Sequence, residues 1–332
     1  MTDAEKKRHI DTILEVSAQG SIYRMEYEQL INEHFDLFDS LIHEKQYFIP
    51  WHRYFILQYE NLLRKADCTF TVAYWDWSLD SRDPFSTGPE NVWNSDTGFG
   101  GDGVEAHQNC VLDGPFRKGA WNRVRPNNPR DPLPDCLTRD FDGDPPEEID
   151  VTRVLSIDDF TTFEFALRDE LHNTVHCQIL GTMCSHESAS APEFFLHHGF
   201  SDKIWDDWQK KSPAHKYAYF PTVQGNMPGT DLRPARLIDL SNQPGGVSVE
   251  YEPYDPEERI RSRLQGKKMF MYIDLCIKHV PVSSYSNNLF HFSFPSLPPF
   301  SLYALLLPIL LSFFLLFFYC FGGGHGISLF VK

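Results

Sequence analysis

Residues 43–55 read HEKQYFIPWHRYF, and an amphipathic run follows directly. Pro50 suits the first turn of a helix, because its φ is already helical and its missing N–H would have no partner there. We therefore expect a helix from Pro50 to about Lys65. His52 falls in phase with the apolar residues of that helix, which are Phe55, Ile56, Tyr59 and Leu63. A single histidine on a buried face is more often a core imidazole bonded to the backbone than a metal ligand.

A second helical pattern lies upstream, over residues 24–42, with His34 at its centre. His34, His43 and His52 are therefore three imidazoles within nineteen residues. We expect His34 and His52 to face inward. This grouping shifts the interpretation from an isolated core histidine toward a metal site.

Three more histidines follow about 120 residues later. Four-residue spacing places His172 and His176 on one face of a helix. On its own, such a pair is more often coincidence than a metal site in a chain with fourteen histidines. His198 falls in phase with the aromatic residues of the next helical run, which are Phe194, Phe195, Trp205 and Trp208. His197 is rotated by about 100° from that stripe, so we expect it to play a supporting role.

The composition argues against some classes of function. The formal net charge of −16 argues against nucleic acid as a partner, because phosphate binding needs a basic surface. The length of 332 residues fits one large domain or two small ones. Seven cysteines is an odd number, so at least one is unpaired or lies outside the folded domain. The first eight residues lack the apolar core of a secretory signal, so either the protein stays inside the cell or the chain begins after its true start.

Other segments are distinguished by their residue patterns. Residues 3–19 predict a short charged helix, and residues 68–78 predict a short strand or an extended segment. Residues 79–148 are rich in Asp, Gly, Pro and Asn and predict a long irregular excursion. Residues 212–265 predict wrapping loops or a trailing strand.

The last part of the chain changes character after Gly266. Residues 266–301 predict a linker rich in Ser, Pro and Phe. Residues 302–321 are almost continuously apolar, and about twenty such residues span a bilayer. One interpretation is a transmembrane helix, which would make the membrane a partner. The other is a tail that is not native protein, because a translated pyrimidine-rich non-coding stretch would have the same composition.

The two groups of three histidines contain no carboxylate. Di-iron helical bundles and two-metal hydrolases use carboxylates to hold their ions. Coordination by imidazoles alone suits copper well and zinc acceptably. Paired sites indicate two-electron chemistry on a molecule that bridges the metals.

With these motifs the chain resembles the type-3 copper proteins, which include tyrosinases, catechol oxidases and the molluscan haemocyanin domain, and it is most like invertebrate tyrosinase-like domains. The first copper motif is matched by residues 43–53, with Glu60 at the expected offset. Residues 27–34 are similar to the upstream ligand helix. The second motif is matched by residues 172–176 and 192–202. Both long motifs occur in the right order and at the right separation, so the likeness is specific.

The resemblance implies a mainly α fold, in which an antiparallel four-helix bundle holds a dinuclear copper site, with long irregular loops and few short strands. The copper-binding domain would span residues 1–265, with its core at about 20–215. The implied cofactor is a pair of copper ions that uses O₂ to oxidise small phenols and o-diphenols to o-quinones. The implied copper ligands are His34, His43, His52, His172, His176 and His198.

Two further residues resemble the catalytic pair that holds a water in hydroxylating members of the family. They are Asn173, next to His172, and Glu164, eight residues upstream. If both are placed in that way, the water can deprotonate an incoming phenol, and monophenols become substrates. The alternative for Glu164 is an ordinary solvated carboxylate on a helix.

The sequence also departs from the family pattern. Ala191 stands where an acidic residue usually precedes Pro192, which removes a cap from the start of a helix. Leu41 stands two residues before His43, where some relatives have a cysteine, so we expect no Cys–His thioether. The interval between His34 and His43 is short.

Some residues are expected to stabilise the fold. Arg53 and Asp202 would brace the bundle by ion pairing. The disulfides suggested by proximity are Cys177–Cys184 and Cys110–Cys136, and these would fit an oxidising compartment. We therefore expect a secreted or membrane-anchored protein with an extracellular or luminal copper domain and a truncated N-terminus.

Two other functions use the same residues. A haemocyanin-like domain would bind O₂ reversibly and would shield its coppers from phenols with a further domain or plug. The residues after the second motif are few and loop-like, and no repeated domain array is present, which favours the enzyme. A degenerate relative would bind zinc or nothing, and six intact histidines argue against that.

Overall fold

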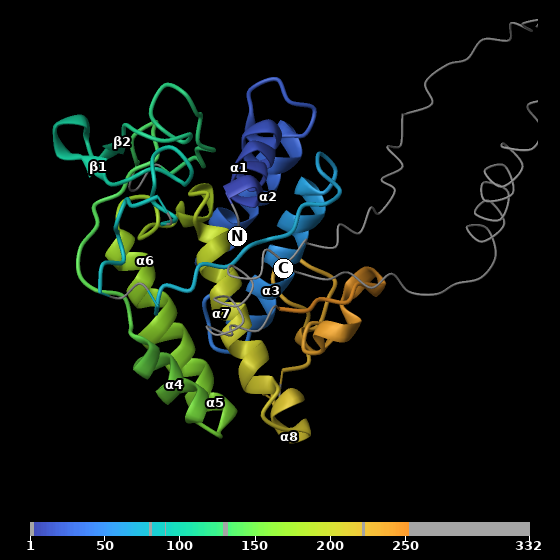
Figure 1. Ribbon diagram of the computed structural model, residues 1–332. Coiled ribbons are helices and arrows are strands. Elements are labelled where there is room, and N and C mark those ends of the chain that lie inside the picture. The colour runs from blue at the N-terminus through green and yellow to red at the C-terminus, as the bar shows by residue number, and fades with distance from the viewer. Residues whose placement is uncertain (1–2, 80–81, 90, 129–131, 221–222, 252–332) are drawn as a thin grey trace, which may run out of the picture. The chain divides into compact units, whose positions relative to one another are not determined.

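The computed structural model describes residues 3–79, 82–89, 91–128, 132–220 and 223–251. Within them the chain is mainly helical, as expected, with one small antiparallel sheet. The six histidines expected to bind copper lie on or next to four helical segments (Figure 1). Two of these segments are helices in the first half of the chain, one is an interrupted helical run, and one is a helix in the second half. These are α2 (Arg24–Leu37), α3 (Phe48–Leu63), the run α5 (Phe160–Phe165), η2 (Ala166–His172) and α6 (Asn173–Ile179), and α7 (Phe194–Gln209).

The remaining elements are shorter or lie outside this group. The helices are α1 (Asp3–Ser17), α4 (Glu148–Ser156) and α8 (Pro213–Lys216). The strands are β1 (Gly103–Val104) and β2 (Cys110–Val111), and Gly103 lies opposite Val111. Single 3₁₀ turns are η1 (Glu105–His107), η3 (Ser188–Ser190), η4 (Pro234–Arg236), η5 (Leu240–Asn242) and η6 (Pro244–Gly246).

Two helix boundaries differ from the sequence-based expectation. The helix expected over 24–42 ends at Leu37, because the chain then turns and Leu41 adopts a positive φ of 70°, which is incompatible with an α-helix. The helix expected to begin at Pro50 begins at Phe48. Pro50 still lies in the first turn, where its missing N–H removes no hydrogen bond. His43 therefore lies in the turn between α2 and α3.

The strand or extended segment expected over residues 68–78 is not a strand: residues 70–76 belong to no helix, strand or turn, and they lie between turns at residues 68–69 and 77–79. Instead, the N–H of Trp75 donates to the carbonyl of Leu196 in α7 at 3.1 Å. Trp77 is fully buried, so this segment is part of the core.

The long excursion between α3 and α4 is irregular, as expected, but it is firmly attached. The expected disulfide between Cys110 and Cys136 is present. Arg139 is fully buried; its Nη1 donates to the carbonyls of Gly100 and Gly101 at 2.8 Å each, and its Nε donates to Glu193 at 2.8 Å. These contacts hold the excursion against the N-terminal end of α7.

The segment after α8 wraps back onto α3 and α7. Arg53 pairs with Asp202 at 2.7 Å, which confirms the expected brace, and its guanidinium lies 3.7 Å from the centre of the Trp205 ring. The same guanidinium donates to the carbonyl of Leu237 at 2.9 Å. The hydroxyl of Tyr251 donates to the second Asp202 oxygen at 2.6 Å.

Replacing Tyr251 by phenylalanine is expected to lower the free energy of unfolding by about 1–2 kcal/mol, because a buried carboxylate oxygen loses its donor. Urea unfolding followed by fluorescence measures the change. The matched control is Tyr217→Phe, since Tyr217 is exposed and its hydroxyl lies 3.5 Å from Asp239. Equal effects of the two substitutions would show that the Tyr251 contact contributes little.

Several expectations concern residues that the structure does not describe. The domain boundary at 265, the linker 266–301 and the apolar segment 302–321 all lie outside the described residues. Among the described residues, no helix has both the length and the apolar character needed to cross a bilayer.

Candidate metal centre

The first group of histidines comes together at one end of α2 and α3. His34 lies on α2, His43 in the following turn and His52 on α3. The ring centres are 5.2 Å apart for His34 and His43, and 5.2 Å for His43 and His52. One ligand nitrogen from each ring lies within 4.8 Å of the others. His34 therefore lies in the first group, although only eight residues separate it from His43 in the sequence.

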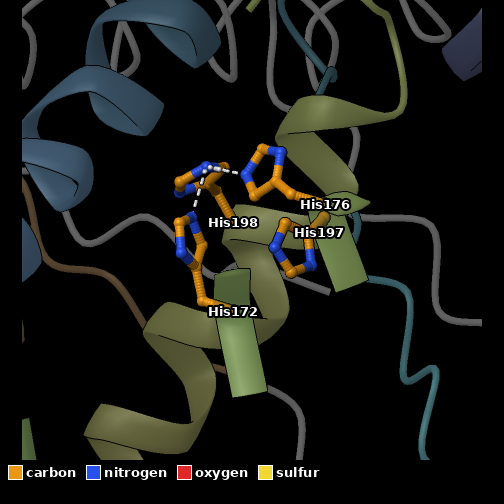
Figure 2. A group of neighbouring side chains, drawn as sticks. All are labelled: His172, His176, His197 and His198. Carbon is orange, nitrogen blue, oxygen red and sulfur yellow. Dashed lines mark hydrogen bonds between the residues drawn. The ribbon is translucent and has the colours of Figure 1, made fainter. Parts of the chain in front are cut away.

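The second group forms where η2, α6 and α7 meet. His172 is the last residue of η2, a π-helical turn, and His176 lies one turn later in α6. The Nε2 atom of His198 lies 3.2 Å from that of His172 and 3.1 Å from that of His176 (Figure 2). Three imidazole nitrogens thus converge on one point.

The two groups are neighbours in space. The rings of His52 and His198 stack with their centres 4.5 Å apart and their planes within 12°. Phe194 packs against both groups, 4.0 Å from the ring of His198 and 5.0 Å from that of His34. The sequence showed that Phe194 is in phase with His198, but its place between the groups depends on how α2 packs against α7.

Backbone carbonyls fix the tautomers of several imidazoles. The Nδ1 atoms of His52, His43 and His176 donate to the carbonyls of residues 48, 38 and 183 at 2.8, 3.1 and 2.7 Å. A proton on Nδ1 leaves the Nε2 lone pair free, which is the form that binds a metal.

The electrostatics also favour neutral imidazoles. Burial lowers the pKa of His176 to about 4, and it lowers the pKa values of His34, His52 and His198 well below the usual histidine value. Positively charged imidazoles this close together would repel each other. Neutral imidazole is the ligand form of histidine.

Unpartnered nitrogens mark the places where a ligand is expected. Both ring nitrogens of His34 and the Nε2 of His52 are buried and have no hydrogen-bond partner among the residues that the structure describes. Leaving such atoms unsatisfied costs about 1–3 kcal/mol each, and metal coordination would offset that cost. The donor set consists only of imidazoles, which fits a pair of copper ions.

His197 is a fourth imidazole beside the second group. Its ring stacks on His172 with centres 5.0 Å apart, and it meets His176 edge-on at 4.7 Å. Both of its nitrogens are buried. These contacts agree with a supporting role, although the sequence did not indicate that His197 would be so close to the site.

Glu164 is not the solvated carboxylate that the alternative interpretation assumed. Its side chain is only 1% exposed, and burial raises its pKa to about 7. Arg168 opposes this rise by donating to Glu164 Oε1 at 2.8 Å. Asn173 is exposed, and its Oδ1 lies 2.9 Å from Nδ1 of His172.

The second expected disulfide, Cys177–Cys184, is also present. It closes a short loop that includes Met183, whose carbonyl accepts the Nδ1–H of His176. The disulfide therefore restrains the loop that orients one imidazole of the second group.

The sequence of this chain is similar to those of known proteins. The family model of the common central domain of tyrosinase matches residues 21–211. The tyrosinase of Streptomyces antibioticus is 30% identical over 272 residues, which cover 72% of this chain and 93% of that protein. Grixazone synthase of Streptomyces griseus is 30% identical over 275 residues, covering 67% and 86%. Tyrosinase ustQ of Aspergillus flavus is 31% identical over 194 residues, covering 52% and 51%. The chain therefore belongs to the tyrosinase family of dicopper oxidases.

Proposed function

We propose that this protein uses O₂ to oxidise o-diphenols to o-quinones, and that it also hydroxylates monophenols. The observation that carries the proposal is the meeting of two imidazole groups through the stacked rings of His52 and His198. The proposed ligands of one copper are His34, His43 and His52, and those of the other are His172, His176 and His198.

When bound, the two copper ions supply the electron transfer between the phenol and O₂. The protein holds the imidazoles in their neutral form and keeps the site largely dry. Of the six proposed ligands, His43 is the one that is half-buried, and the other five are buried. A phenol would therefore approach beside His43, which supports an enzyme over a shielded O₂ carrier.

The proposed proton acceptor for a monophenol is Glu164, acting through a water near Asn173. The carboxylate can accept a proton only when it is ionised, and its pKa is raised to about 7. Hydroxylation of a monophenol is therefore expected to increase with pH through about 7, whereas oxidation of an o-diphenol has less need of this base.

The test is an absorption spectrum of the full chain, loaded with copper, reduced and exposed to O₂, before and after addition of an o-diphenol. A near-ultraviolet band that gives way to quinone supports the oxidase. The same band without turnover would indicate an O₂ carrier. Repeating the experiment with a monophenol tests hydroxylation, and Glu164→Gln should reduce that step more than diphenol oxidation.

We also propose that the copper domain works in an oxidising compartment. The support is the pair of disulfides, Cys110–Cys136 and Cys177–Cys184, since such bonds persist mainly in secreted or luminal proteins.

A further inference from the structure

A continuous series of side-chain contacts joins Glu164 to His172. Arg168 Nε donates to Glu164 Oε1 at 2.8 Å, and Arg168 Nη1 donates to Asp169 Oδ1 at 3.1 Å. The same Asp169 oxygen accepts from Asn173 Nδ2 at 2.8 Å. Asn173 Oδ1 then accepts from His172 Nδ1 at 2.9 Å. Arg168 and Asp169 thus connect the proposed base to a proposed copper ligand.

We propose that Arg168 and Asp169 are positioning residues of this site: Arg168 keeps Glu164 in its proton-accepting form, and Asp169 holds Asn173 with its carbonyl oxygen toward His172. The inference rests on the proposed function, because it assigns both residues a part in monophenol hydroxylation and in binding of the second copper.

The charges around Glu164 explain the part of Arg168. The carboxylate is buried, and burial alone would favour its protonated form. Arg168 contacts it directly, with its own side chain 18% exposed. The other groups that act on Glu164 are Asp169, which favours protonation, and the exposed Lys45, which opposes it; the phenol of Tyr219 also lies within its electrostatic reach. Without Arg168, the pKa of Glu164 would rise further, and more of its carboxyl group would be protonated at a given pH.

The chemistry of an amide explains the part of Asp169. An ionised carboxylate can only accept hydrogen bonds, so the NH₂ end of Asn173 must face Asp169. The carbonyl end then faces His172 and requires a proton on Nδ1, which leaves Nε2 free for copper. In His52 and His176 the Nδ1 proton is held instead by a backbone carbonyl, which cannot exchange its oxygen for a donor by rotating. The side-chain amide of Asn173 can rotate, so it needs a partner that fixes its direction.

The first experiment measures the ionisation of Glu164 by NMR in the full-length protein loaded with copper(I) and kept under argon. Copper(I) is diamagnetic, so it does not broaden the resonances. The carboxyl ¹³C resonance of Glu164, assigned with Glu164→Gln, is followed against pH. Arg168→Gln is expected to raise the titration midpoint by about one pH unit, because a cation in contact lowers the pKa of an acid by about 1–3 units. At pH 7 the ratio of monophenol to o-diphenol oxidation should then fall about fivefold and recover at higher pH.

Two variants control this experiment. Arg153→Gln removes another arginine that pairs with the η2 segment, through Glu170 at 2.6 Å, but that pair is exposed. It should leave the Glu164 midpoint unchanged. Arg168→Lys keeps a cation near Glu164 and should restore part of the wild-type midpoint. An unchanged midpoint in Arg168→Gln overturns the role assigned to Arg168.

The second experiment compares copper affinity by competition with a copper(I) chelator. Asp169→Ala is expected to weaken binding of the second copper by about tenfold, the usual effect of losing a group that orients a ligand. The control is Glu170→Ala, which removes the neighbouring exposed carboxylate. Equal affinities of the two variants would overturn the role assigned to Asp169.

These results can be separated from failure of the proposed function. If the wild-type protein oxidises no phenol, the proposed function is wrong. The carboxyl titration and the chelator competition need no turnover, so they still decide whether Arg168 and Asp169 position Glu164 and Asn173.

Discussion

Replacing His198 by alanine is expected to remove one of the two copper ions and to lower o-diphenol oxidation by at least about a hundredfold. The Nε2 atom of His198 lies within 3.2 Å of those of His172 and His176, so the variant removes one of three converging donors. Because His198 also stacks on His52, the loss falls where the two groups meet. Copper per chain, measured by atomic absorption, and initial oxidation rates check the result.

The matched control is His107→Ala. His107 lies in η1, is exposed and belongs to neither histidine group, so both copper ions and the activity should remain. If His198→Ala keeps both ions, His198 is not a required ligand. His197→Ala makes the complementary test, since a supporting residue should affect copper affinity without removing an ion.

Local sequence patterns marked most of the histidines that meet, but they did not mark His43, which lies in a turn, or the closeness of His197 to the second group. His52 and His198 fall in phase with large apolar residues, and His172 and His176 have helical spacing. These patterns depend only on the period of the helix, so they can be recognised in the sequence without knowledge of the fold. The resemblance to a family then related the two groups to each other.

Other features depend on contacts between distant segments and could not be read from local patterns. The sequence did not indicate that Arg139 would enter the core, since arginine is usually exposed, and its partner Glu193 lies 54 residues away. The sequence also contained no pattern that predicted the π-helical turn η2. It nevertheless brings Glu164, Arg168 and Asp169 into the series of contacts that ends at His172. The early end of α2 at Leu37 likewise depended on the turn that carries His43.

Replacing Glu193 by glutamine is expected to lower the free energy of unfolding by about 3–5 kcal/mol. The pair formed by the carboxylate of Glu193 and the guanidinium of Arg139 is fully buried, with side chains 1% and 0% exposed. The variant therefore leaves a positive charge inside the protein without its counter-ion. A neutral amide can still accept one hydrogen bond, but it cannot offset the cost of removing the guanidinium from water.

The location of this pair extends its effect to the metal centre. Glu193 directly precedes α7, which carries His198, and Arg139 fixes the excursion through the carbonyls of Gly100 and Gly101. Urea unfolding of the copper-free protein should therefore show a large loss, with weaker copper retention in the loaded protein. The matched control, Glu170→Gln, breaks the exposed pair with Arg153 and should cost no more than about 1 kcal/mol. If the two substitutions cost the same, the buried pair does not hold the excursion to α7, and the hydrogen bonds from Arg139 to backbone carbonyls carry that role alone.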